Sequence, residues 1–383
     1  MQVSVMCLKK FHAFNLAEQL NKHDSLKHLY TSFYGKFGSK QNNHNINIPS
    51  DRVRTNPFLA LLSYGYNPFS DLWVWNKFGE WAAKHIRDED IVISWGLSAL
   101  PIIREAKERG IIAIVERGSA HAEVQRNLLI DEYERHGQPI DKLKRSFSSE
   151  RMERELLEYE LADYIEVPSE FARRSFIEQG IPAEKLIKGF RGVDLTAFSE
   201  LPASDDVFRV IYTGQMSLQK GVQYLLQAFA ELKLANAELW LFGGEQPEIE
   251  PFFENYEGHY RHFGPVSQRT LHEYYAHGSV FAICSIQDGF GQVIPQAMAC
   301  GLPVISTFNT GANDVVEEGV QGFTVPIRDV EAIKEKILYL YENPEICREM
   351  GQSAKRKVQQ GLTWDDYGNL IVQKYSDCLK YRM

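Results

Sequence analysis

One short stretch of the sequence combines a carboxylate, a glycine-rich turn and the start of a helix. Residues 284–301 read CSIQDGFGQVIPQAMACG, and an apolar run ends shortly before Asp288. Pro295 is tolerated only in the first turn of a helix, and Gly301 suits a left-handed C-terminal cap. We therefore predict a strand, then a turn, then a helix over residues 293–300.

The turn in this stretch has the composition of an anion-binding loop. Gly289 and Gly291 let the backbone approach a ligand closely and point N–H groups at it. The helix N-terminus adds partial positive charge, so the turn predicts a phosphate or diphosphate cradle. A plain turn between strand and helix is the alternative. Asp288 favours the cradle, because a carboxylate beside an anion is costly unless it serves a sugar hydroxyl or a developing positive charge.

A second strand, turn and helix follow the same pattern at residues 212–221, YTGQMSLQKG. Lys220 alone would be interpreted as a solvated lysine beside a helix start. Its position between Gly214 and Gly221 instead favours contact with an anion.

Strands and helices alternate through both halves of the chain, which is typical of a parallel, doubly wound sheet in each half. We predict an α/β protein with two Rossmann-like domains, at residues 1–190 and 195–362, and a final helix within 365–383 that crosses back to the first domain. The carboxyl ends of both sets of strands would then face one cleft, where open parallel sheets bind ligands. The predicted strands are 3–8, 26–34, 90–96, 111–116, 163–169, 208–214, 237–244, 280–285 and 303–307; the predicted helices are 13–22, 99–110, 149–162, 219–233, 268–276, 294–300, 330–343 and 363–381, with one more capped by Ser169.

Length and composition agree with two globular domains and exclude several classes of protein. A chain of 383 residues exceeds what one core usually supports, and 44% hydrophobic content excludes disorder. The net charge of −9 argues against a nucleic-acid partner. The five cysteines are scattered, which predicts neither disulfides nor a zinc site. No leader or membrane span is visible, so we expect a cytoplasmic location, with peripheral contact at the inner face of the membrane as an alternative.

The motif around Asp288 resembles the signature of a known family. DGFGQVIPQAMACGLPVIST, followed by TGANDVVEEGVQGFTVPIRD, is similar to that of the retaining GT-B glycosyltransferases of family 4, the group 1 glycosyltransferases. Their motif has an acid before G-F-G, a second acid eight residues later, and then A-x-x-x-G-x-P-V. The resemblance covers residues 160–365 well and implies the GT-B fold, in which two Rossmann-like domains face each other.

The resemblance implies roles for residues of the second domain. Asp288 takes the position of the first motif acid, beside the donor sugar, and is the predicted catalytic residue. Gln296 stands where the family usually has a glutamate that holds the ribose, a departure that should weaken nucleotide binding about tenfold. The other predicted donor-binding residues of this motif are Gly289, Phe290, Gly291, Gln292 and Val293.

A second departure concerns the phosphate clamp. Family members commonly carry arginine after the glycine at 214, whereas this sequence has Gln215 and keeps Lys220. Gly214, Gln215 and Lys220 are thus predicted to bind the donor diphosphate with half of the usual charge. We expect no metal and no resident cofactor, and a UDP-sugar is the donor we expect first.

In the first domain, the resemblance points to residues 115–125, VERGSAHAEVQ. His121 is predicted to contact the donor sugar as a second catalytic residue, although a lone histidine is more often structural. Arg117 and Ser119 are the predicted acceptor-binding residues. The first strand-to-helix turn, residues 9–20, lacks the Gly-Gly pair common in the family, and His12 within it is a weaker candidate.

Residues 52–77 combine many aromatic residues with Arg52, Arg54 and Lys77. Such a surface could meet a membrane interface or a lipid-linked acceptor, and burial between the domains is the alternative.

The sequence therefore predicts a retaining hexosyl-type transferase that moves a sugar from a nucleotide-sugar to a saccharide or lipid-linked acceptor, in synthesis of cell-surface polysaccharides or glycoconjugates. Three alternatives stay open. They are another reaction on the same fold, such as epimerisation or phosphorolysis; a two-lobed sugar-binding protein; and a non-catalytic partner of an active transferase, which Gln215 and Gln296 would suit.

Overall fold

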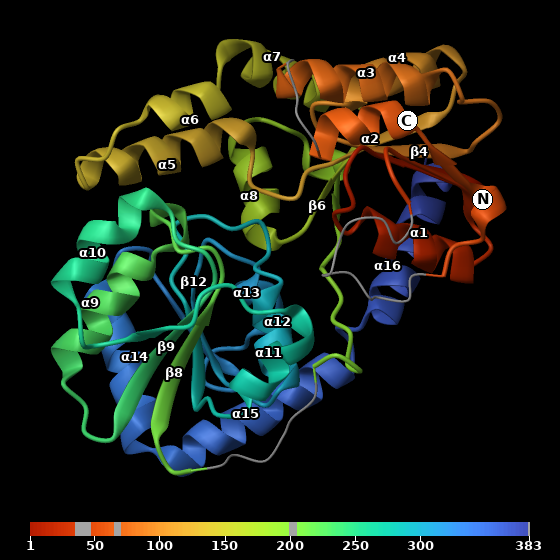
Figure 1. Cartoon of the computed structure of the whole chain (residues 1–383). Helices are drawn as coiled ribbons and strands as arrows, with labels where there is room; N and C mark the ends of the chain where they lie inside the picture. The colour runs from red at the N-terminus through yellow and green to blue at the C-terminus, as the bar shows by residue number, and fades with distance from the viewer. Residues whose placement is uncertain (35–46, 65–69, 199–204, 382–383) are drawn as a thin grey trace.

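The computed structural model describes residues 1–34, 47–64, 70–198 and 205–381 and has two lobes (Figure 1). Each lobe is built on one sheet, and every strand pair within the two sheets is parallel. Helices cover both faces of each sheet, so most strand residues are buried. This arrangement confirms the predicted GT-B architecture.

The first domain contains a seven-stranded sheet and most of the first eight helices. Its strands, in spatial order, are β3 (Val53–Thr55), β2 (Leu26–Thr31), β1 (Val3–Cys7), β4 (Ile91–Trp95), β5 (Ile112–Glu116), β6 (Tyr164–Val167) and β7 (Leu186–Lys188). The helices are α1 (Ala13–Lys22), α2 (Pro57–Tyr64), α3 (Asp71–Ala83), α4 (Ala99–Glu108), α5 (Ala122–Arg135), α6 (Asp141–Ser146), α7 (Ser149–Leu161) and α8 (Glu170–Glu178), with short 3₁₀ turns η1 (Ser50–Arg52) and η2 (Ala183–Lys185).

The second domain contains a six-stranded sheet. Its strands, in spatial order, are β10 (Arg261–His262), β9 (Ala237–Phe242), β8 (Phe208–Thr213), β11 (Val280–Ile283), β12 (Val304–Thr307) and β13 (Gly322–Val325). The helices that follow the strands are η3 (Leu218–Lys220), α9 (Val222–Leu232), η4 (Pro247–Ile249), α10 (Glu250–Asn255), α11 (Gln268–Tyr275), α12 (Val293–Ala299), α13 (Ala312–Val315), α14 (Val330–Glu342), α15 (Pro344–Gln359) and α16 (Trp364–Lys380).

The strand orders identify where each sheet opens toward a ligand. In the first sheet, the strands up to β3 are added on one side of β1 and those from β4 onward on its other side, so the strand order reverses between β1 and β4. In the second sheet the strand order reverses in the same way between β8 and β11. Loops that leave neighbouring strands on opposite sides of such a point diverge and leave a crevice at the carboxyl ends of the strands. The motifs around Lys220 and Asp288 follow β8 and β11, so both lie at this crevice of the second sheet.

Helix α16 returns to the first domain, as predicted, and packs against α1 (Figure 1). Tyr367, Ile371 and Tyr375 of α16 are fully buried in the core that also contains Val3 and Val5. The two chain segments that cross between the domains run side by side, because the N–H of Val193 bonds to the carbonyl oxygen of Leu362 over 2.9 Å.

A buried polar network surrounds this crossing. Arg191, 5% exposed, pairs with Glu116 at the end of β5 and lies 3.6 Å from Glu166 on β6. Tyr367 and Tyr375 of α16 donate hydrogen bonds to Glu166 over 3.1 and 2.5 Å. Burial opposes ionisation of Glu116, but the charges of His12 and Arg191 outweigh it and lower its pKa. The network joins the segment between the domains, which carries Arg191, to the first sheet and to α16.

Helices α5 and α6 leave the first domain and lie over the second, beside α9 and α10 (Figure 1). Leu129, Tyr133 and Leu143 from this segment are buried in the hydrophobic core of the second domain. We call residues 122–147 the arm. The sequence indicated neither the arm nor helix α15, because neither carries a motif and each owes its position to tertiary packing.

The predicted helix over 219–233 is interrupted. Gly221, with φ of 66°, separates η3 from α9. A Cβ at this position would lie 1.8 Å from the carbonyl oxygen of Cys284, so the turn after β8 contacts the end of β11 backbone to backbone. The glycine that was interpreted as part of an anion site therefore also lets the two loops of the crevice meet.

Candidate active site in the cleft

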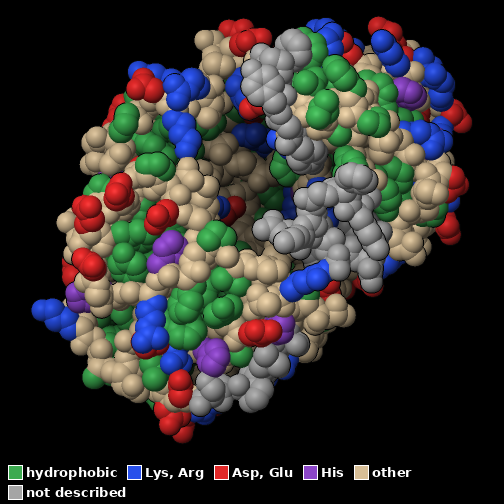
Figure 2. Space-filling view, viewed as in Figure 1, with side chains coloured by type: hydrophobic (Ala, Val, Ile, Leu, Met, Phe, Trp, Pro, Cys, Tyr) green, Lys and Arg blue, Asp and Glu red, His purple; other side chains and the backbone are tan. Residues whose placement is uncertain are grey.

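Lys220 and Asp288 form an ion pair across the crevice between β8 and β11. Their side chains are 22% and 19% exposed, so both remain accessible from the cleft. Figure 2 shows a hollow between the two lobes, with acidic and basic side chains on its walls. The predicted anion-binding lysine and the predicted catalytic acid thus lie together, although 68 residues separate them in the chain.

The loop after β11 is shaped by the carboxylate it carries. Oδ1 of Asp288 accepts hydrogen bonds from the N–H groups of Phe290 and Gly291 over 3.4 and 3.2 Å. Gly291 has φ of 78°, a conformation that favours glycine. The Phe290 ring is 4% exposed in the core of the second domain. The loop is therefore anchored by one aromatic ring and folded around Asp288.

The start of α12 contributes two glutamines. Gln292 donates from Nε2 to the carbonyl oxygen of Gly192 over 2.6 Å, which links the motif to the segment between the domains. Val293 begins the helix, Pro295 lies in its first turn, and Gly301 follows it with φ of 83°, as predicted.

Gln296 is 5% exposed, and its buried Oε1 atom has no hydrogen-bond partner among the described residues. An unpaired buried acceptor carries a free-energy cost that a donor from a ligand, such as a ribose hydroxyl, would remove.

The loop after β8, like the loop after β11, contains a glycine with positive φ. Gly214 has φ of 153°, and its N–H bonds to the carbonyl oxygen of Phe242 over 2.9 Å. The Gln215 side chain is exposed, and the backbone carbonyl oxygen of this residue accepts a hydrogen bond from the Tyr212 hydroxyl over 2.9 Å. Burial, and after it the charge of Asp288, raise the pKa of Tyr212, so this hydroxyl stays protonated and keeps donating.

The first domain reaches this loop through Ser119 and Gln287. Gln287, fully buried one residue before Asp288, donates from Nε2 to Oγ of Ser119 over 2.5 Å. Gln219 in turn donates to the side-chain and backbone oxygens of Gln287 over 3.3 and 3.2 Å. The sequence motif did not single out Gln287, because a buried amide before the acid carries no pattern of its own.

The structure places Arg117 inside the first domain. It pairs with Glu155 over 3.2 Å and donates to Gln125 over 2.7 Å and to the carbonyl oxygen of Ala120 over 3.3 Å. These contacts hold the guanidinium within the first domain. Of the two predicted acceptor-binding residues, Arg117 and Ser119, it is therefore Ser119 that lies against the Asp288 loop.

The His121 ring also lies within the first domain. It packs 5.3 Å from Tyr159 and 5.0 Å from Phe176, measured between ring centroids, and its Nδ1 caps α5 by accepting from Glu123 N–H over 3.3 Å. Burial, followed by the charge of Arg117, lowers the pKa of His121 to about 4, so the ring is neutral at pH 7. Its predicted contact with a donor sugar stays a prediction.

Ser169 and Gly118 complete the contact between the domains. Ser169 caps α8, as predicted, by accepting from Ala172 N–H over 3.1 Å, and it also donates to the carbonyl oxygen of Gly289 over 2.5 Å. A Cβ on Gly289 would lie 2.0 Å from the carbonyl oxygen of Gly118. Only the cap was predicted from the sequence.

Within the described ranges, no three His, Cys, Asp or Glu side chains form a group that could hold a metal ion. The five cysteines are buried.

The sequence and the fold were compared with known proteins. Residues 207–343 match the family model of the glycosyl transferases group 1. The capsular polysaccharide biosynthesis glycosyltransferase CapM of Staphylococcus aureus is 29% identical over 181 residues, which are 46% of this chain and 48% of CapM. The chain thus spans less than half the length of such curated relatives.

Two solved structures share the fold over nearly the whole chain. Sucrose-phosphate synthase from Thermosynechococcus elongatus has a TM-score of 0.75 at 20% identity, covering 99% of this chain and 100% of that one. HepE of Anabaena, solved in complex with UDP-glucose, has a TM-score of 0.69 at 17% identity, covering 98% and 100%. Residues 207–343 are therefore similar to the group 1 glycosyl transferase domain, and the chain has the two-domain GT-B fold.

Proposed function

We propose that the chain transfers a sugar from a nucleotide-sugar, most readily a UDP-sugar, to a saccharide or lipid-linked saccharide with retention of configuration. One observation carries this proposal. The loops after β8 and β11 bring Lys220 and Asp288 together in the crevice of the second sheet, facing the first domain. A cation and an acid at this point suit a ligand with a diphosphate at one end and a sugar at the other.

In the proposed complex, the donor diphosphate takes the place of Asp288 as the partner of Lys220. The backbone amides of the Gly289–Gly291 turn add hydrogen-bond donors, and the amide of Gln296 binds the ribose hydroxyls. The single ammonium and these N–H groups neutralise the diphosphate in our proposal without a metal ion. The UDP-glucose complex of HepE supports a donor of this class.

Asp288, once released from Lys220, would position the sugar and offset positive charge that develops on its ring. The bond between the anomeric carbon and the phosphate oxygen breaks while the acceptor hydroxyl attacks from the same face. The acceptor proton passes to the departing phosphate, so the step needs no protein base. In this proposal Ser119 faces the acceptor from the first domain. Arg117 and His121 would reach the acceptor and the sugar only after leaving their contacts within the first domain.

We further propose that the acceptor belongs to cell-surface polysaccharide or glycoconjugate synthesis, which the function in CapM's name supports. Residues 52–77 suit a lipid-linked form of such an acceptor. Helix α2 packs against α3 of the first domain and exposes Phe58 and Leu61 by 62% and 66%, beside exposed Arg54 on β3. Residues 65–69 lie outside the described residues.

Contact with a membrane is tested by sedimentation with vesicles of phosphatidylcholine and phosphatidylglycerol. The double variant F58S/L61S should lose binding that the wild type shows, because both side chains are exposed apolar groups. Retention of the double variant on vesicles would remove α2 from the proposal. None of the helices in the described residues has the length and apolar content that a membrane-crossing segment requires.

A nucleotide-binding partner without catalytic activity is the second candidate. Gln215 and Gln296 favour it, because each replaces a charged residue of the family motif with a neutral amide. Such a protein would bind nucleotide-sugars but would not cleave them.

Nucleotide release separates these functions. The protein is incubated with UDP-, GDP- and ADP-glucose, with and without saccharide acceptors, and free nucleoside diphosphate is measured. Release that disappears in Lys220→Met supports the transferase. Stabilisation by a nucleotide-sugar without release supports the non-catalytic candidate, and a protein that none of the nucleotides stabilises contradicts both.

A further inference from the structure

Glu132, on the arm, is a fully buried carboxylate at the boundary between the domains. Its neighbours Leu129 and Tyr133 lie in the hydrophobic core of the second domain, so apolar packing already holds the arm in place. Transferring a carboxylate from water into such an interface is costly unless charges and hydrogen bonds compensate it. The contacts of Glu132 therefore indicate what it does there.

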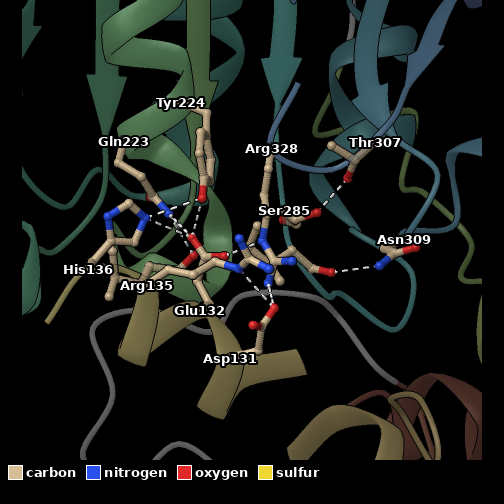
Figure 3. Close-up of polar contacts among 12 residues, drawn as sticks. Asp131, Glu132, Arg135, His136, Gln223, Tyr224, Ser285, Thr307, Asn309 and Arg328 are labelled. Atoms are coloured by element: carbon tan, nitrogen blue, oxygen red, sulfur yellow. Dashed lines mark hydrogen bonds and ion pairs between the residues drawn. The ribbon is translucent and has the colours of Figure 1, made fainter. Parts of the chain in front are cut away.

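Four side chains surround this carboxylate (Figure 3). Oε2 of Glu132 accepts from Nε of Arg328 over 2.6 Å, and Oε1 accepts from the Tyr224 hydroxyl over 2.7 Å and from Nε2 of Gln223 over 2.8 Å. Nε2 of His136 lies 3.1 Å from Oε1. Tyr224 and Gln223 both belong to the first turn of α9, directly after the turn that carries Lys220.

Gln223 connects Glu132 to that turn. Its Nε2 donates to Glu132 and also, over 3.2 Å, to the carbonyl oxygen of Leu218, the first residue of η3. Both partners are acceptors, so only the side-chain NH₂ group of Gln223 can face them. Lys220 ends η3, and Gly221 after it adopts the left-handed conformation. Glu132 thus orients, from the arm, the amide group that bonds to the first residue of η3.

We propose that Glu132 is a positioning residue of the donor site, which acts through Gln223 to hold η3 so that the Lys220 ammonium faces the donor diphosphate. This inference rests on the proposed function, since it assigns Lys220 to the diphosphate. It makes the phosphate contact of the second domain depend on a residue of the first domain. Loss of the hydrogen bonds that Gln223 makes to Glu132 and Leu218 lets η3 relax, which weakens binding of the terminal phosphate more than binding of the nucleoside.

The test uses two probes that differ by one phosphate, UDP and UMP, with GDP and GMP or ADP and AMP if those stabilise the wild type more. Dissociation constants are measured by calorimetry on the folded full-length chain. Gln223→Met keeps the side-chain length, leaves Glu132 paired with Arg328 and removes the bond to Leu218. We expect it to weaken UDP binding about three- to tenfold and UMP binding less than twofold.

Glu132→Gln should change the UDP to UMP affinity ratio in the same direction. Tyr133→Phe is the matched control, because it removes a hydrogen bond of 2.6 Å from the arm to Glu248 on η4, away from η3. It should leave the affinity ratio unchanged. If Glu132→Gln does not fold, Gln223→Met and the control still decide the question.

Two results would overturn the inference alone. They are a Gln223→Met protein with the wild-type affinity ratio, and a Tyr133→Phe protein whose ratio falls equally, which would reduce Glu132 to a structural contact of the arm. Lys220→Met identifies failure of the proposed function. If it binds UDP as tightly as the wild type, or if no diphosphate binds the wild type, the donor site is wrong and this inference fails with it.

Discussion

Ser169 of the first domain donates a hydrogen bond of 2.5 Å to the carbonyl oxygen of Gly289, in the loop that carries Asp288. A Cβ on the same residue would lie 2.0 Å from the carbonyl oxygen of Gly118, so no side chain fits there. The two domains therefore meet at the main chain of residue 289, one position from the predicted catalytic acid.

Gly289→Ala should reduce nucleotide release from the donor about 100-fold, because relieving the clash with the Gly118 carbonyl moves the Asp288 loop by about an ångström. Gly244→Ala is the control, since a Cβ there has no atom within 4 Å. Release assays on both variants check this. Wild-type rates in Gly289→Ala would mean that the contact does not persist in the active protein.

Asp288→Asn should lower the rate of nucleotide release about 10²- to 10³-fold, because the negative charge that offsets the developing positive charge is lost. The affinity for UDP should be equal or higher, since the variant releases Lys220 from its ion pair. Kinetics and calorimetry test the two effects separately. Asp206→Asn, at an exposed carboxylate before β8, should change neither quantity, and an equal loss in this control would exclude a specific role for Asp288.

Gln296→Glu should strengthen UDP binding up to about tenfold, because a carboxylate accepts hydrogen bonds from ribose hydroxyls more strongly than an amide. The free protein should be less stable, since the new charge would lie at a position that is 5% exposed and where no described residue donates to the existing Oε1. Calorimetry and thermal unfolding measure these opposite changes. Weaker UDP binding by the variant would place the ribose elsewhere.

His121→Asn should remove part of the acid sensitivity of folding. The pKa of His121 falls from 6.5 to about 4 on burial, so between these values the unfolded chain binds more protons than the folded one. The corresponding stability is complete above pH 6.5 and is lost as the pH falls toward 4, amounting to about 3 kcal/mol at most. Asparagine keeps the helix cap without titrating.

Urea unfolding at pH 7.5 and 4.5 measures this difference for the wild type and the variant. An unchanged pH dependence in His121→Asn would contradict it. Nucleotide release by the same variant at pH 7.5 checks the proposed contact of His121 with the donor sugar separately, because that contact requires a loss of activity.

The fold was predictable where periodicity and local signals agree. Pro295, Gly301 and Ser169 mark helix ends through their own backbone chemistry, and the structure has those ends where they were expected. The presence of Lys220 and Asp288 at one crevice follows from parallel-sheet topology, because the loops after the two strands at a switch point line the same crevice.

The contacts between the domains could not be predicted, since they depend on how two separate cores dock. Glu132 looks like an ordinary polar residue of an exposed helix, yet it is fully buried against the other domain. The orientation of the Arg117 and His121 side chains was equally inaccessible. The sequence predicts that both residues follow the end of a strand. The ion pair of Arg117 with Glu155 and the packing of His121 against Phe176 are instead set by tertiary packing.

The return of α16 to the first domain has a consequence during protein synthesis. Tyr367 and Tyr375 fill the core of the domain that is translated first, so this core is complete only after residue 375 has left the ribosome. At about 5–20 residues per second, the first domain waits roughly 10 to 40 seconds with an apolar surface open to solvent. Nascent chains should therefore engage chaperones through residues 1–190 until α16 has emerged from the ribosome.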